Sequence, residues 1–224
     1  MKKTGFTLAE VLITLAIIGV VATMTLPALM TNTNEQQSKT GLKKMINTLT
    51  LAAETNSANN GFDFASITTS TASEDNQVQS LYALLMLNTN VDRGANMTST
   101  SDVSVLKTGG GTKSMASGNY TIFFKDGTAV SYAPSVLSTG TKNSAVQNDG
   151  VPYGIPVLVD TNGKKGPNAL SNCQHLALTA DNDHSTTNQC NNKAERVIKD
   201  QFSVRLRGIY AVPNGDAARW AFEN

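Results

Sequence analysis

The 224-residue sequence predicts an α+β fold, in which a long N-terminal α-helix, membrane-spanning in its first half, packs against a small antiparallel β-sheet head. Three observations support this prediction. Residues 11–34 carry no charge, residues 42–53 repeat apolar side chains at helical spacing, and short β-rich runs separated by turn residues follow residue 119. We therefore expect one membrane helix that continues into one modest globular domain.

The uncharged run at 11–34 consists mainly of Leu, Ile, Val and Ala. A helix of about 20 such residues crosses the roughly 30 Å hydrocarbon layer of a membrane. Glu10 stands at the start of this run, where a carboxylate is costly unless it finds a partner. Either Glu10 reaches the headgroups and gains from the helix dipole, or another molecule supplies a positive charge.

A short motif covers the start of this helix. The residues KKTG (2–5) and FTLAE (6–10) resemble the leader and cleavage site of type IV pilins and type II secretion pseudopilins. The resemblance implies that a prepilin peptidase cuts between Gly5 and Phe6, that Phe6 is then N-methylated, and that the subunit polymerises through its N-terminal helix. The positions that the resemblance assigns to assembly are Glu10, Gly19 and Pro27.

The liberated amine of Phe6 offers a partner for Glu10. On an incoming subunit this cation can pair with Glu10 of a neighbour, because pairing in a low-dielectric environment lowers the cost of both charges. Two alternatives remain for the same segment. The first is an ordinary secretory signal peptide, although no Ala-x-Ala site follows the segment, and the second is an uncleaved single-span anchor.

The composition limits the partners. The chain has 18 basic and 17 acidic residues and a formal charge of +1, which becomes −1 when Lys2 and Lys3 leave with the leader. Such a charge balance gives no excess of positive charge to bind nucleic acid, so we do not expect nucleic acid as a partner. The partners that we expect are copies of the chain itself, other pilin-like subunits, the prepilin peptidase, an inner-membrane assembly platform and, before assembly, membrane lipid.

No nucleophile and base stand in a catalytic grouping in the sequence, so we expect neither an enzyme nor a cofactor.

The two cysteines, Cys173 and Cys190, indicate export. A disulfide between them closes a loop of about 17 residues and stabilises the head by on the order of 3 kcal/mol in the chain-entropy model. Lys2 and Lys3 favour a cytoplasmic N-terminus only weakly, and the disulfide supports a head outside the cytoplasm. The alternative is a metal site that adds His175 and His184, whose spacing lacks the regularity of structural zinc sites.

The chain divides into five predicted segments. These are a leader at 1–5, a transmembrane and polymerisation helix at 6–30, an amphipathic helix half at 31–58, an irregular region at 59–118, and an antiparallel β head at 119–224 with a disulfide loop at 173–190. The amphipathic half should bury Leu42, Met45, Ile46, Leu49, Ala52 and Ala53. Gly19, Pro27 and Gly41 weaken the long helix, and a short helix is expected over 78–87.

The head should contain four strand segments. The runs 120–124 and 129–132 flank Asp126-Gly127, which indicates a hairpin, and a further strand is expected over 155–159. Residues 202–212 alternate with period two and predict one strand with Arg205 and Arg207 outward. Trp220 and Phe222 should end the chain as a last short strand or a packed tail.

Two glycine-containing motifs admit a ligand interpretation. Asp160-Thr161-Asn162-Gly163 favours a tight turn over a calcium loop, because its glycine comes too early and no bidentate acid follows. The segment 109–113 favours a solvated loop over a phosphate loop. Asp160-x-Asn162-Gly163 followed later by Asp200-x-Phe202 also resembles the head-domain hairpin of many bacterial pilin-like proteins.

The sequence therefore predicts a structural subunit of a type IV pilus or a type II secretion pseudopilus, held in the inner membrane and then part of a periplasmic or cell-surface filament. The alternatives are a minor pilin of a DNA-uptake or adhesion pilus, or a single-span membrane-anchored extracytoplasmic binding protein.

Overall fold

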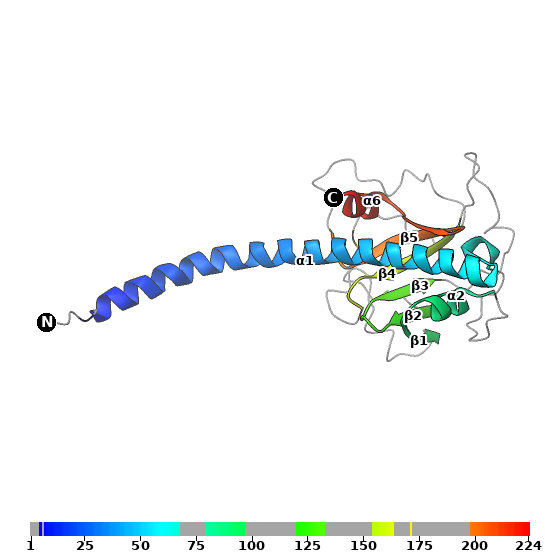
Figure 1. Ribbon diagram of the computed structural model, residues 1–224. Coiled ribbons are helices and arrows are strands. Elements are labelled where there is room, and N and C mark those ends of the chain that lie inside the picture. The colour runs from blue at the N-terminus through cyan, green and yellow to red at the C-terminus, as the bar shows by residue number, and fades with distance from the viewer. Residues whose placement is uncertain are drawn as a thin grey trace. The chain divides into compact units, whose positions relative to one another are not determined.

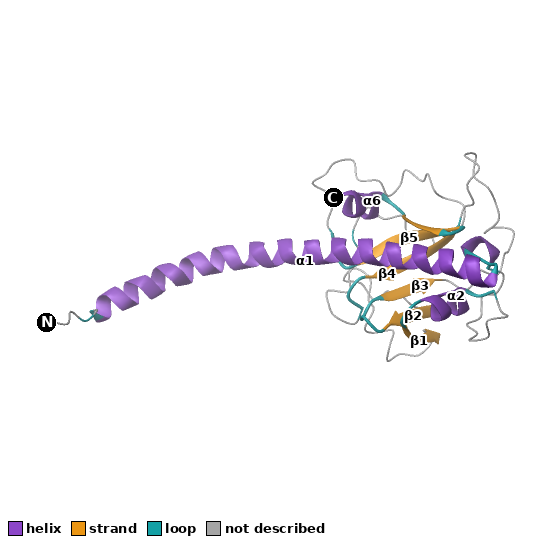
Figure 2. Cartoon of the chain, in the orientation of Figure 1, coloured by secondary structure: helices purple, strands orange, loops and turns teal. Residues whose placement is uncertain are grey.

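The computed structural model describes residues 5, 7–67, 79–96, 120–132, 154–163, 171 and 198–224. The chain forms two compact units, an N-terminal unit (Met1–Gln37) and a head unit (Ser38–Asn224). Helix α1 (Leu8–Asn60) runs through both, and all strands belong to the head unit (Figures 1 and 2). The predicted α+β class, with a long apolar N-terminal helix and an antiparallel sheet, is confirmed.

In the N-terminal unit, α1 is long and apolar enough to cross a membrane, by length and composition. Its large apolar side chains are all exposed; they are Leu8, Val11, Leu12, Ile13, Leu15, Ile17, Ile18, Val20, Val21, Met24, Leu26, Leu29 and Met30. Threonine hydroxyls bond to backbone carbonyls one turn earlier, as Thr23 does to Val20 and Thr25 to Val21. These hydroxyls therefore have an acceptor within the helix and need none from water.

The described strands of the head unit form one six-stranded antiparallel sheet in which every strand pairs with the next along the chain, in the order β1-β2-β3-β4-β5-β6. The strands are β1 (Val91–Asn96), β2 (Tyr120–Phe124), β3 (Ala129–Tyr132), β4 (Ile155–Asp160), β5 (Gln201–Arg207) and β6 (Tyr210–Pro213). The predicted hairpin at Asp126-Gly127 is confirmed: Gly127 N–H donates to Phe124 O at 3.0 Å, and Gly127 has a φ of +90°.

The head part of α1 lies across one face of this sheet (Figure 1). The predicted apolar stripe is confirmed, because each of its six residues, Leu42 to Ala53, is at most 3% exposed. These side chains join alternate residues of the central strands in one hydrophobic cluster, among them Ile122, Val130, Val157 and Val204. Burial of a large aliphatic side chain contributes roughly 1.5–3 kcal/mol, so this contact stabilises the head.

Asn56 closes the end of α1 against its neighbours. Its buried amide donates to Phe62 O at 2.7 Å and accepts from Asn60 and Asn88 at 2.8 and 3.0 Å. Asn88 ends helix α2 (Leu81–Asn88), which confirms the expected short helix from residue 81 onward, whereas residue 78 of the expected range lies outside the described residues. A 3-10 turn, η1 (Phe64–Ser66), follows α1. One amide therefore ties α1 to α2.

At Gly41 the turn after β4 packs closely against α1. A Cβ built on Gly41 would lie 2.7 Å from Thr161 Cβ, which is shorter than any ordinary contact. Helix α1 continues through Gly41, and the absence of a side chain there permits the close packing of the β4 turn on α1.

The expectation of one strand over 202–212 is wrong. Strand β5 ends at Arg207, Gly208 turns the chain with a φ of +52°, and β6 returns beside it with Tyr210 opposite Arg207. A two-residue hairpin needs a positive φ at its first position, which Gly208 supplies. The last segment is a helix, α6 (Asp216–Glu223), whose Trp220 and Phe222 pack against the core, so the packed tail is confirmed and the alternative of a last strand is wrong.

The predicted outward position of Arg205 is also wrong. Arg205 is only 1% exposed and Arg207 is half-buried. Every residue from Gln201 to Leu206 is buried, so both faces of β5 are covered. Alternation of apolar and polar residues places the polar ones in water only where one face of the sheet is solvated.

Strand β1 was not expected from the sequence. Its residues VDRGAN include one β-branched side chain and three poor strand formers, Asp, Gly and Asn. Pairing with β2 imposes the strand, with an irregularity between Val91 and Arg93.

Candidate assembly site

The start of α1 is closed by a reciprocal pair of side chains. The N–H and the hydroxyl of Thr7 both donate to Glu10 Oε2 at 2.8 Å, and Glu10 N–H donates to Thr7 Oγ1 at 3.3 Å. Because the helix begins at Leu8, Thr7 is its N-cap and Glu10 its third residue. This arrangement is a capping box.

The capping box gives Glu10 a partner inside its own chain. The sequence interpretation considered only headgroups, the helix dipole and a neighbouring molecule, and it did not identify Thr7. The signal was the Thr-x-x-Glu spacing itself, which is typical of helix N-termini. A carboxylate accepts about four hydrogen bonds, and Thr7 supplies two. Glu10 can therefore accept a further cation while its cap is retained.

The other predicted assembly residues do not contact Glu10. Gly5 precedes the helix and is exposed, and Phe6 lies outside the described residues. Gly19 and Pro27 are both inside α1, and nothing lies within 4 Å of the place where a Cβ of Gly19 would be. The structure thus distributes Glu10, Gly19 and Pro27 along one helix.

The predicted disulfide falls outside the described residues. Cys173 and Cys190 are not described, and neither are His175 and His184 of the alternative metal site. Across the described part of the chain, no group of three or more His, Cys, Asp or Glu side chains could hold a metal ion. The disulfide stays a prediction.

A second candidate site is the turn after β4. Asp160 is fully buried, and its Oδ1 accepts the N–H groups of Asn162 at 3.1 Å and Gly163 at 2.6 Å. Its Oδ2 accepts Nε2 of Gln201 at 2.9 Å. The predicted tight turn is confirmed, and the carboxylate is what holds it.

Burial raises the pKa of Asp160 to about 7; the negative charge of Asp200 acts in the same direction, and the bond from Gln201 and the two turn amides oppose it. Thr161 N–H donates to Asp200 O at 2.9 Å, which joins the turn to the start of β5. The residues of the second resemblance, Asp160 and the Asp200–Gln201 pair, therefore meet in space. They form a structural joint between β4 and β5.

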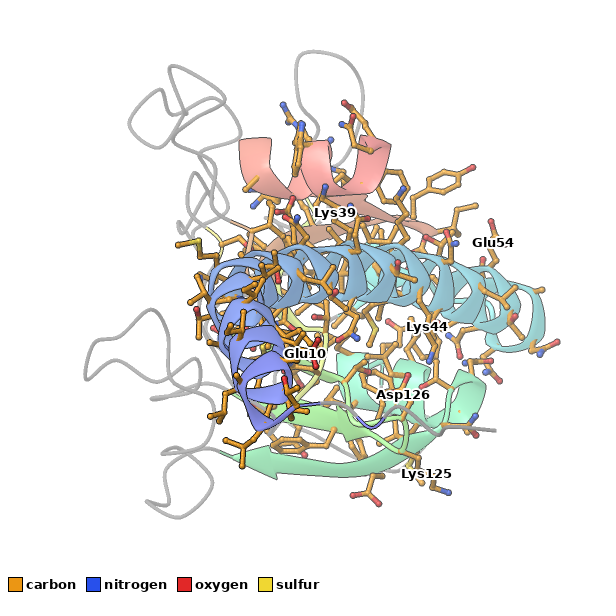
Figure 3. The ribbon with its side chains drawn as sticks, turned by 90° about the vertical axis from the view of Figure 1, so that its left-hand side faces the viewer. Glu10, Lys39, Lys44, Glu54, Lys125 and Asp126 are labelled. Carbon is orange, nitrogen blue, oxygen red and sulfur yellow. The ribbon has the colours of Figure 1, made fainter. Side chains whose placement is uncertain are left out.

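A polar hollow lies between α1, the end of α2 and the β2–β3 hairpin. It is lined by Lys44, Thr48, Asn88, Thr89, Asn90, Phe124, Lys125 and Asp126. Lys44 Nζ lies 2.7 Å from Asp126 Oδ2, and Figure 3 shows the two side chains between α1 and the β2–β3 hairpin. Partial burial raises the pKa of Asp126, but hydrogen bonds from Lys44 and Thr128 outweigh it and hold that pKa below its ordinary value. The pair fastens the hairpin to α1, although an exposed ion pair contributes at most about 1 kcal/mol.

Comparison with known families relates the start of the chain to a described motif. Residues 1–26 match the family model described as a prokaryotic N-terminal methylation motif. No curated protein and no solved structure matches the chain. The match covers Gly5, Phe6, Glu10 and Gly19, so it includes the predicted cleavage position and the capping box.

Proposed function

The methylation motif at residues 1–26 is the hallmark of type IV pilins and pseudopilins, and on this basis we propose that the chain is a structural subunit of a type IV pilus or a type II secretion pseudopilus. A prepilin peptidase removes residues 1–5, Phe6 is methylated, and the N-terminal helices of many copies pack together. The observation that carries the proposal is this motif at the start of a membrane-length apolar helix.

The proposed route begins in the inner membrane, with the head outside the cytoplasm and, in that compartment, a Cys173–Cys190 disulfide. An assembly platform then moves the subunit into a periplasmic or cell-surface filament. The exposed apolar side chains of α1 support this route, because lipid covers them first and neighbouring helices cover them afterwards. Apolar burial is thus retained throughout.

Glu10 has two successive partners in this proposal. In the membrane, Thr7 caps the carboxylate from within the chain. At assembly, the methylated amine of Phe6 on another copy adds to the same carboxylate, since Thr7 leaves acceptor capacity unused. Glu10 then fixes the position of one helix against the next.

Exchange of Glu10 for Gln separates these two roles. A glutamine caps a helix through the same reciprocal bonds but carries no charge. We therefore expect Glu10→Gln to be membrane-resident and processed, yet absent from sheared or purified filaments. Thr7→Ser, which keeps the cap, is the matched control and should assemble. Filaments of Glu10→Gln at the wild-type level would show that the charge pair is not required.

Exchange of Gly5 tests the processing step. Gly5→Leu should block cleavage, so mass spectrometry of the N-terminal peptide should find residues 1–5 retained, whereas the wild-type peptide should begin at methylated Phe6. Gly19→Ala lies inside the helix with open space around it and should be processed normally. A wild-type chain that begins elsewhere would instead favour the single-span anchored binding protein.

A further inference from the structure

The chain contains three Asn-Gly steps, at Asn60, Asn162 and Asn214, and all three lie in the described part of the chain. Asparagine is thermally labile, because the backbone nitrogen of the next residue can attack its side-chain carbonyl carbon. A glycine in the next position favours this attack, since it has no Cβ to block the approach and adopts a wide range of backbone angles. The reactivity of each step therefore depends on how the fold holds the asparagine side chain and the glycine N–H.

The step at Asn162 is held by the buried carboxylate of Asp160. The attacking nitrogen would be that of Gly163, whose N–H donates to Asp160 Oδ1 at 2.6 Å, and Gly163 is itself buried. Asn162 N–H donates to the same oxygen at 3.1 Å. An attack at this step would first have to break these bonds inside the head, so the fold protects Asn162.

The step at Asn214 is held through the asparagine itself. Asn214 is only 2% exposed, and its Nδ2, the group that would leave as ammonia, donates to Ser203 Oγ at 3.0 Å. Its N–H donates to Ser203 O, also at 3.0 Å. The reaction would require the chain after β6 to separate from β5, so the fold protects Asn214 as well.

The step at Asn60 is held much less tightly. Asn60 is the last residue of α1, and both Asn60 and Gly61 are exposed. Gly61 N–H donates to Ser57 O at 3.1 Å, and nothing lies within 4 Å of the place where a Cβ of Gly61 would be. The ends of helices open at a free-energy cost close to zero, so the Gly61 nitrogen is released without unfolding of the head.

From these differences we propose that Asn60 is a site of spontaneous deamidation in the folded chain. The Gly61 nitrogen bonds to Asn60 Cγ, the bond between Cγ and Nδ2 breaks, and Nδ2 takes the proton of the Gly61 nitrogen and leaves as ammonia. Water then opens the resulting succinimide ring at either carbonyl, which leaves aspartate or isoaspartate at position 60. The reaction needs only water, and the inference does not depend on the proposed function.

The modification acts on the amide contact that ties α1 to α2. Asn56 Oδ1 accepts from Asn60 Nδ2 at 2.8 Å, and Asn56 cannot turn its own amide toward residue 60 without losing its bond to Phe62 O. A carboxylate at position 60 would therefore face an oxygen with no donor between them. A negative charge is also unfavourable at the C-terminal end of a helix. Deamidation should thus loosen the end of α1.

Mass spectrometry of the three peptides measures the rate at each step. The full-length chain in mild detergent is incubated in heavy-oxygen water at mildly alkaline pH, beside the same chain unfolded in urea, and the heavy oxygen marks deamidation that occurs during incubation. We expect Asn60 to react within about threefold of its rate in the unfolded chain. Asn162 and Asn214 should react at least about tenfold more slowly than in the unfolded chain, because they react only after local opening.

Gly61→Ala is the matched variant for the chemistry. Its Cβ has open space but shields the attacking nitrogen, so the reaction at Asn60 should slow severalfold while the other two steps keep their rates. Equal protection of all three steps in the folded chain, or a faster reaction at Asn162 or Asn214, overturns the assignment of Asn60. So does an unchanged rate at Asn60 in Gly61→Ala.

Thermal unfolding tests the effect on the amide contact. Asn60→Asp reproduces one product of the reaction, and Asn59→Asp adds the same charge at the neighbouring exposed position. We expect Asn60→Asp to lower the melting temperature of the head more than Asn59→Asp does, because only position 60 is bonded to Asn56. An equal shift in the two variants shows that the charge alone matters and overturns the proposed effect.

Discussion

The exchange of Asp160 for Asn should remove a pH dependence of head stability. Asp160 is fully buried, and burial raises its pKa from 3.8 to about 7. Between these two values the folded head holds a proton that the unfolded chain has released. Because the folded state binds more protons, the free energy of unfolding decreases as the pH rises through this window.

The size of the effect follows from the two pKa values. At 1.36 kcal/mol for each pKa unit, the shift of Asp160 corresponds to about 4 kcal/mol at most, lost progressively from about pH 4 to pH 7 and constant above. The pKa of Asp126 is shifted in the opposite direction, below 3.8, so its contribution is lost only as the pH falls below about 4. The two windows do not overlap.

Asp160→Asn keeps an oxygen that accepts from Asn162 and Gly163 but cannot ionise. Gln201 can present its amide oxygen to the new NH₂ group by rotating its side-chain amide. We expect this variant to unfold at the same temperature across pH 4 to 8, and to be more stable than the wild type at pH 8. The assay is thermal unfolding of the full-length chain in mild detergent, followed by near-ultraviolet circular dichroism.

Asp160→Ala is the matched control for this experiment. It removes the acceptor of both turn amides, so it should be less stable than the wild type at low pH, where the wild-type carboxyl is neutral and still accepts their hydrogen bonds. The reasoning is refuted if the wild type becomes more stable as the pH rises from 5 to 7, or if Asp160→Asn retains the wild-type pH profile.

Two further predictions concern packing in the head and use the same melting assay. Gly163→Ala should destabilise the head by at least about 2 kcal/mol, because Gly163 has a φ of +61° and its Cβ would collide with Gly127 O. Gly61→Ala is the control, since Gly61 shares the positive φ but has open space around it, and this variant should lose clearly less stability. Equal losses of stability in the two variants would show that the collision is unimportant. Asn56→Leu should cost about 1–3 kcal/mol, since the buried Phe62 carbonyl loses its donor, and an unchanged melting temperature would contradict that.

The elements predicted well from the sequence are those whose pattern depends on one buried face. The stripe from Leu42 to Ala53 follows helical spacing because only one side of α1 meets the sheet. The hairpin at Asp126-Gly127 follows from local turn chemistry. Both are decided within a few residues, so the sequence contains all that is needed.

The elements predicted poorly depend on contacts between distant segments. Strand β1 has weak strand propensity and forms because β2 pairs with it. Arg205 is buried because both faces of β5 are covered, which no alternation within β5 can indicate. The joint at Asp160 depends on a bond from Gln201, 41 residues later, which no local pattern indicates. The resemblance to the hairpin of pilin-like heads suggested this pairing, whereas periodicity did not.

The candidate assembly site combines one local feature with one that depends on other molecules, so the sequence does not indicate the two features equally well. The cap of Glu10 is local, since Thr7 stands three residues earlier, and a search for Thr-x-x-Glu finds it. The exposed apolar surface of α1 from Leu8 to Met30 is different, because covering it requires lipid or further copies of the chain. A single chain in water would leave this apolar surface exposed beside the capped carboxylate. The proposed function gives both features a use, because lipid covers the surface first and neighbouring helices of the proposed filament cover it afterwards.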